Sequence, residues 1–174
     1  GLQEQQVLAC GKHFPGHGNT DSDSHFSLPV INQSAAEMDS VELYPFRELI
    51  KNVIASMTVA HLFIPAYDRT TNLAATLSPK VINELLRNKM GFGGLIFTDA
   101  LNMKGVAEFY PSGELELKAL QAGNDVLLYS SDVPAAWMRI HYAIQNCEID
   151  QDVIDAKVKR ILMAKHWAGL HQPS

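Results

Sequence analysis

The sequence predicts an α/β fold in which parallel strands are covered by helices. Short apolar segments alternate along the chain with longer segments of helical periodicity. The apolar segments are hydrophobic almost throughout, as expected for parallel strands buried on both faces. Polar side chains follow directly after these segments, and the carboxyl ends of parallel strands are where active sites form in such folds.

Four strands are expected, each a short apolar run bounded by glycine, asparagine or histidine. They are residues 6–11, 53–61, 92–98 and 124–129. The first strand is followed by a loop over residues 12–29 that contains proline, glycine and several histidines. A loop of this length is uncommon in a compact α/β unit and favours a functional role.

Five helices are expected between and after the strands. They are residues 40–52, 79–90, 112–122, 132–146 and 151–168. Ser78 is a typical N-cap with Pro79 at the first helical position, and Gly91 follows the same helix as a stop. Asp132 and Asp150 are placed to cap the last two helices.

Composition indicates one ordinary globular domain over residues 1–174, with 47% hydrophobic and 19% charged residues. The net charge of −5 argues against nucleic acid or an anionic membrane as partner. No apolar run is long enough for a transmembrane helix, and Cys10 and Cys147 show no metal-binding spacing. We expect no cofactor. The chain begins without Met, and four strands cannot close an eight-stranded barrel. We therefore expect an open sheet or half barrel cut from a longer chain.

Asp99 stands directly after the third apolar segment. One interpretation is a helix N-cap, a position that aspartate suits well. The other is a catalytic carboxylate at a strand end, where it could attack an electrophilic carbon.

Asp23 and His25 lie two residues apart in the long loop. A carboxylate orients an imidazole and raises its basicity, so the pair could move a proton near neutral pH; a solvated loop is the alternative. Lys12 and His13 follow the first strand and could bind sugar hydroxyls, or be an exposed lysine and a packed histidine. His61 ends the second strand and is either part of the site or a buried, satisfied histidine.

Two other functions fit the same residues. A metal-dependent hydrolase could use the histidines and Asp99 as ligands, although no metal-binding histidine motif is present and we expect no metal. A non-catalytic half barrel could serve as a binding or assembly surface.

Several segments resemble one family, the β-N-acetylglucosaminidase branch of glycoside hydrolase family 3. The segment KHFPGHG at residues 12–18, followed by Asp-Ser-His at 23–25, resembles the signature of this branch. MTVAH at 57–61, FTDALNM at 97–103 and AGNDVLL at 122–128 are similar to later strand ends of the family. The resemblance covers nearly the whole chain in the family's order.

The resemblance implies a TIM barrel of which this chain supplies strands five to eight. It implies a retaining glycosidase that removes β-linked N-acetylglucosamine-type sugars, including those derived from peptidoglycan. Asp99 would be the nucleophile, and His25, oriented by Asp23, the acid and base. Lys12 and His13 would bind the sugar, and His61 would lie near it.

The chain departs from the family in lacking the first four strands, and it has Asn19 where Asp is common. The fragment alone should therefore be inactive and should need the missing half, or a second copy, as a partner besides its carbohydrate substrate. Family members occur in cytoplasm and periplasm, and residues 94–103 lean toward the longer extracytoplasmic type.

Overall fold

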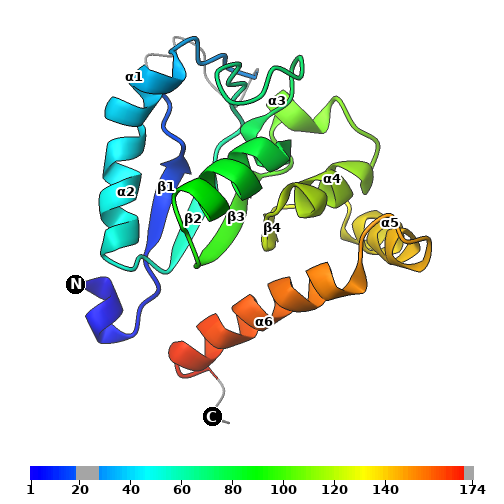
Figure 1. Cartoon of the computed structure of the whole chain (residues 1–174). Helices are drawn as coiled ribbons and strands as arrows, with labels where there is room; N and C mark the ends of the chain where they lie inside the picture. Colours follow the sequence, from blue (N-terminus) through cyan, green and yellow to red (C-terminus); the bar gives the residue numbers. More distant parts are fainter. Residues whose placement is uncertain (19–27, 171–174) are drawn as a thin grey trace.

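The computed structural model describes residues 1–18 and 28–170 and confirms the α/β class. Its centre is a four-stranded parallel sheet with the strands in chain order, β1-β2-β3-β4 (Figure 1). The strands are β1 (Cys10–Phe14), β2 (Ser56–Val59), β3 (Leu95–Ala100) and β4 (Val126–Leu128). All four carboxyl ends therefore lie at one edge of the sheet, which we call the carboxyl edge; the opposite one is the amino edge.

The first strand begins later than the sequence predicts. Residues 2–5 form a short 3₁₀ helix, η1 (Leu2–Gln5), and β1 starts to pair with β2 only at Cys10. Gly11 lies against the side chain of Leu49, and Phe14 packs edge-on against Phe46 at 5.2 Å between ring centroids. The predicted strand over residues 6–11 was therefore wrong in its bounds, because tertiary packing selects Gly11 and Phe14 as the buried positions.

All five predicted helices are present with shifted ends, and smaller ones are added. The helical segments after η1 are α1 (Ala35–Ser40), α2 (Leu43–Lys51), η2 (Ala75–Leu77), η3 (Lys80–Lys89), α3 (Lys104–Ala107), α4 (Glu114–Ala122), α5 (Val133–Gln145) and α6 (Gln151–Trp167). The segment η3 is wound as a π-helix and has Pro79 as its N-cap, one residue later than predicted. The Ser78 hydroxyl nevertheless accepts a hydrogen bond from the amide of Val81. Helix α1 was not predicted, although Ser34 and Glu37 form a capping box at its start.

Helices cover one face of the sheet. Met57, Val59 and Ile96 of the two central strands are buried in one cluster with residues of η3 and with Phe46 of α2. This packing is the main core of the described structure. Cys10 and Lys12 of β1 remain exposed. Within the described residues, β1 and β4 are the two outermost strands and each has one side without a strand partner.

Helix α6 lies across the amino edge and is held there by charged side chains (Figure 1). The carboxylate of Asp125, which directly precedes β4, accepts hydrogen bonds from Arg87 of η3, Arg160 of α6 and the backbone amide of Ile96. The ammonium group of Lys157 donates to the carbonyl of Asn124 at 2.8 Å. We call the side chains of Asp125, Arg87, Arg160 and Lys157 the amino-edge cluster.

Among the helices of the described residues, none is both long enough and apolar enough to span a membrane. Cys10 and Cys147 are free thiols.

Candidate functional site

Asp99 lies at the carboxyl edge, near the end of β3. The preceding residue, Thr98, is fully buried, and its hydroxyl accepts a hydrogen bond from the amide of Leu128 at 2.8 Å, which ties β4 to β3 at this point. The Asp99 side chain is 18% exposed, and its Oδ1 accepts a hydrogen bond from the amide of Ala100 at 2.9 Å. Asp99 belongs to the strand, and the next helix begins only at Lys104. The helix N-cap interpretation is therefore wrong.

His13 of β1 reaches across the end of β2 to Asp99. Its Nε2 lies 3.8 Å from Oδ2 of Asp99, within the range of an ion pair when the ring is protonated. His17 meets the His13 ring edge-on, with ring centroids 5.9 Å apart. Lys12 is exposed at the same end of β1. The structure thus brings His13 and Asp99 together from segments 86 residues apart in the sequence.

The sheet is irregular where these side chains are found. The central strands β2 and β3 pair in one register from Ser56↔Leu95 to Val59↔Thr98. The pairing of β1 with β2 shifts between Gly11 and Phe14, and that of β3 with β4 shifts between Phe97 and Ala100. The first interval contains Lys12 and His13, and the second contains Asp99. Strand irregularities of this kind redirect side chains and are frequent beside active sites.

His61 is fully buried behind this edge, and both of its ring nitrogens contact protein. Nε2 lies 3.0 Å from the carbonyl oxygen of Ala100, which can only accept, so Nε2 carries the proton. Nδ1 lies 2.8 Å from the hydroxyl of Thr76, which also lies 2.9 Å from the carbonyl oxygen of Ala60.

Burial lowers the pKa of His61, while the hydrogen bond to Ala100 and the charge of Asp99 raise it in part. This setting favours a neutral, satisfied histidine that fixes the end of β3 over one that contacts a ligand.

Asp23 and His25, the predicted acid/base pair, lie outside the described residues, as does Asn19. Their loop leaves β1 after Phe14 and returns at Val30, which pairs with Phe63 in an isolated parallel bridge. Both ends of this loop are thus anchored in the described structure.

A hollow of about 420 Å³ lies beside Asp99, a size in the range of small-ligand sites. Besides Asp99 and Ala100, it is lined by Asn102, Met103, Lys104 and Tyr129. Sequence reasoning missed these four residues. It looked for polar residues at the strand ends, and neither the loop after β3 nor Tyr129 carried a sequence signal that marked it as part of the site.

Within residues 1–18 and 28–170, no three histidine, cysteine, aspartate or glutamate side chains come together as a metal site would require.

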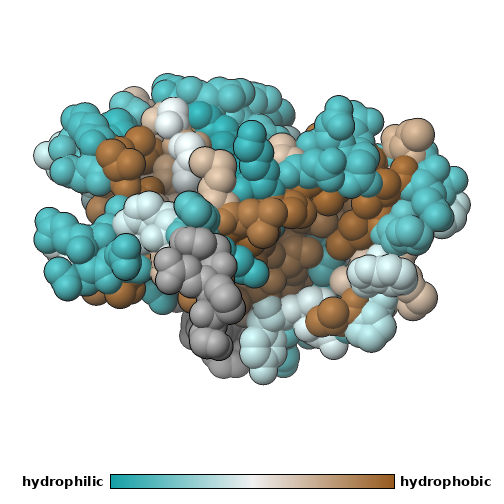
Figure 2. Space-filling view, turned by 90° about the horizontal axis from the view of Figure 1, so that it is seen from below, coloured by the Kyte–Doolittle hydropathy of each residue, from teal (hydrophilic) through white to brown (hydrophobic). Residues whose placement is uncertain are grey.

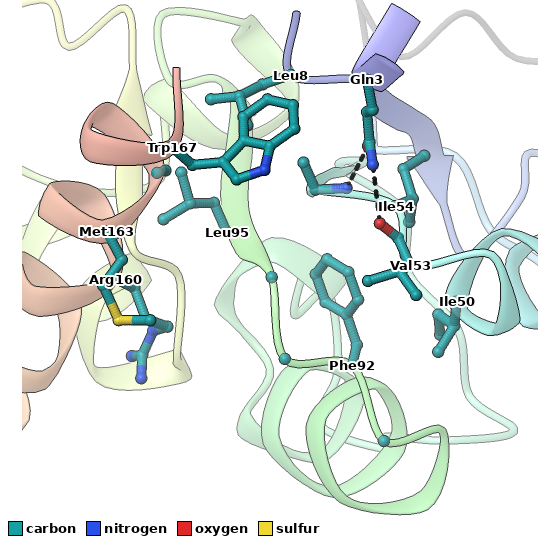
Figure 3. A pocket seen from close by; sticks show the side chains of 15 residues that line it. Gln3, Leu8, Ile50, Val53, Ile54, Phe92, Leu95, Arg160, Met163 and Trp167 are labelled. Carbon is teal, nitrogen blue, oxygen red and sulfur yellow. Dashed lines mark hydrogen bonds between the residues drawn. The ribbon is translucent and has the colours of Figure 1, made fainter. Parts of the chain in front are cut away.

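A second hollow of about 460 Å³ lies at the amino edge, between α6 and the starts of β2 and β3 (Figure 3). Ile54, Phe92, Met163 and Trp167 line it, and Arg160 is its one charged lining residue. Figure 2, which views the molecule from below, shows hydrophobic side chains gathered into an extended area on this face. This lining contains no carboxylate or histidine, so the second hollow offers apolar packing surface and no acid, base or nucleophile.

Comparison with known proteins gives consistent matches. The family model described as glycosyl hydrolase family 3 N terminal domain matches residues 1–164. A β-hexosaminidase of Nitrosospira multiformis is 40% identical over 138 residues, which are 79% of this chain and 39% of that protein. A β-hexosaminidase of Alkalilimnicola ehrlichii is 37% identical over 175 residues, covering 99% of this chain and 48% of that protein.

Among solved structures, a glycoside hydrolase family 3 β-N-acetylglucosaminidase from Paenibacillus sp. str. FPU-7 superposes with a TM-score of 0.94. It is 36% identical, and the match covers 99% of this chain and 33% of that one. The chain thus spans less than half the length of each of these three relatives.

Proposed function

Because this chain belongs to glycosyl hydrolase family 3, we propose that it carries the catalytic edge of a retaining glycosidase. The enzyme removes β-linked N-acetylglucosamine-type sugars, a substrate class that the names of the β-hexosaminidase and β-N-acetylglucosaminidase relatives support. Asp99 is the nucleophile, and His25, oriented by Asp23, is the acid and then the base.

The reaction takes two steps. In the first, a carboxylate oxygen of Asp99 bonds to the anomeric carbon of the sugar, and the bond from that carbon to the leaving oxygen breaks. The protonated imidazole of His25 gives its proton to the leaving oxygen. In the second, the neutral imidazole takes a proton from water, whose oxygen displaces Asp99 and releases the sugar.

This proposal rests on the exposure of the Asp99 side chain and on the groups that surround it. Its carboxylate is partly exposed at the carboxyl edge beside a hollow, and the imidazole of His13 lies 3.8 Å away. Such a carboxylate is accessible to an electrophilic carbon. His13 and the exposed Lys12 bind hydroxyl groups of the sugar, and His61 positions the backbone at Ala100.

We further propose that the chain is the second half of a (β/α)8 barrel, strands five to eight. The open strands β1 and β4 and the apolar area at the amino edge support this arrangement, because exposed strand edges and large apolar areas call for a partner. The four preceding strands, on the same polypeptide or on a second one, complete the site. The 174 residues alone are inactive.

Covalent trapping tests the assignment. The full-length protein is treated with 5-fluoro-N-acetylglucosaminyl fluoride, digested, and analysed by mass spectrometry. We expect the sugar on the peptide that contains Asp99. The ring fluorine slows both steps, but the anomeric fluoride is a good leaving group that keeps the first step fast, so the intermediate accumulates. A label on another carboxylate would reassign the nucleophile, and the absence of turnover or labelling would favour the non-catalytic half barrel.

A further inference from the structure

Tyr129 is the large side chain of the Asp99 hollow that neither the core nor the proposed reaction uses. It directly follows β4, is 70% exposed, and lines the hollow together with Asp99, Asn102 and Lys104. In the described part of the chain, no hydrogen bond to its hydroxyl is present. A large aromatic ring left exposed in a hollow is a common form of binding surface.

The backbone holds Tyr129 firmly in this place. Before it, the carbonyl of Leu128 accepts a hydrogen bond from the amide of Leu101 at 2.9 Å, and the amide of Leu128 donates to the Thr98 hydroxyl. After it, the hydroxyl of Ser130 donates to the buried carboxylate of Glu116. Both neighbours of Tyr129 are thus tied to the fold.

Between these anchors, Tyr129 has a left-handed backbone conformation with φ of 55°. This conformation is unfavourable for a residue with a Cβ atom and persists where the surroundings enforce it. The strand direction therefore ends at Leu128, and the aromatic side chain is presented at the hollow instead of continuing the alternation of β4.

The two sides of Asp99 differ in chemistry. On one side, β1 brings Lys12 and His13, polar groups suited to the hydroxyls of the sugar that is attacked. On the other side, β4 brings the flat ring of Tyr129. The face of a pyranose that carries axial C–H bonds is apolar and fits against an aromatic ring, so the β4 side suits a second sugar ring.

We propose that Tyr129 forms the wall of a subsite for the leaving group, where it stacks against a pyranose ring attached to the sugar that Asp99 attacks. This inference rests on the proposed function and deepens it: the preferred substrate carries a sugar, rather than a small group, on the leaving side. Tyr129 is a specificity residue here and takes no part in bond breaking.

Two substrates distinguish a role of Tyr129 in binding the leaving group from a role that affects every substrate equally. One is the β-linked disaccharide of N-acetylglucosamine, whose leaving group is a sugar ring. The other is N-acetyl-β-glucosaminyl fluoride, whose leaving group has no ring. For Tyr129→Ala in the full-length protein, we expect kcat/KM for the disaccharide to fall about tenfold, mainly through KM, and kcat/KM for the fluoride to change less than about twofold.

Two control variants define the result. Tyr129→Phe keeps the ring and should retain the wild-type kcat/KM for the disaccharide. Tyr44→Ala removes a similarly exposed tyrosine from α2, away from the hollow, and should change neither substrate.

Equal losses on both substrates, or no loss on either, would overturn the leaving-group subsite. A lowered melting temperature of Tyr129→Ala with unchanged kinetics would assign the residue a structural role and overturn it as well. In each of these cases, trapping of Asp99 would still leave the glycosidase assignment standing. A wild-type protein that cleaves neither substrate would instead reject the proposed function itself.

Discussion

Asp99 and Asp125 are carboxylates at opposite edges of the same sheet, and their surroundings differ in almost every respect. Asp125 has a fully buried side chain that accepts hydrogen bonds from two arginines and one backbone amide. Asp99 is partly exposed, accepts a hydrogen bond from the adjacent amide, and lies beside a histidine and a hollow. A carboxylate whose oxygens all accept hydrogen bonds within the protein stabilises the fold. A carboxylate with oxygens that can still accept or bond is available for a substrate.

The largest difference between the two aspartates is expected in catalysis, when Asp99 is replaced. Asp99→Ala in the full-length protein should lower kcat by several orders of magnitude, because covalent catalysis is removed. The melting temperature should change little, since in the described residues the carboxylate is partly exposed and accepts its hydrogen bond from the adjacent amide of Ala100. Steady-state kinetics on an aryl N-acetylglucosaminide, together with a thermal melt, checks both statements. Activity within tenfold of the wild type would refute the nucleophile role.

The opposite result is expected at Asp125. Asp125→Ala removes the anion that faces Arg87 and Arg160, and loss of one partner of a buried ion pair typically destabilises a protein by about 3–5 kcal/mol. Urea denaturation should show this loss, while the kcat of the folded fraction stays near the wild-type value. A large fall in kcat of the folded Asp125→Ala protein would contradict the assignment of catalysis to the carboxyl edge and of stability to the amino edge.

The smallest effect concerns Lys157 of the amino-edge cluster. Burial, together with the charges of Arg160 and Arg87, lowers the pKa of Lys157 to about 8, and the charge of Asp125 opposes this shift. The unfolded chain has a lysine pKa of about 10.4, so between pH 8 and 10 the unfolded state binds more protons, and stability rises with pH.

The free energy of unfolding of the wild-type protein should therefore increase between pH 8 and 10 relative to that of Lys157→Met, by roughly 1–2 kcal/mol. The tyrosines that titrate near this range are the same in both proteins and cancel in the difference. Parallel urea titrations at several pH values measure it. A difference that is flat with pH would show that Lys157 keeps an ordinary pKa.

The α/β class, the four strands and the five longer helices could be predicted from the sequence. Hydrophobic periodicity and capping residues are local signals, and Ser78, Asp132 and Gly123 act at helix ends as expected. The start of β1 could not be predicted, since Val7 is as apolar as a strand residue but is 50% exposed. Only contact with α2 distinguishes Gly11 and Phe14 as the buried positions.

The candidate site also has a part that could be predicted from the sequence and a part that could not. The presence of Asp99 and His13 at one edge follows from parallel topology, and the structure brings them to 3.8 Å. Tyr129 could not be predicted, because its presentation depends on a left-handed backbone between two anchored neighbours. Asp125 was also missed, since its two arginine partners lie 38 and 35 residues away in the sequence.

The two interruptions of the strand pairing have a consequence for how relatives of this protein can diverge. Because the intervals from Gly11 to Phe14 and from Phe97 to Ala100 belong to the sheet itself, the placement of His13 and Asp99 is inherited with the scaffold. The segments that follow the strands can then lengthen, shorten or exchange side chains without separating these two groups. In the proposed mechanism, changes in these segments alter which glycoside is accepted without displacing the nucleophile.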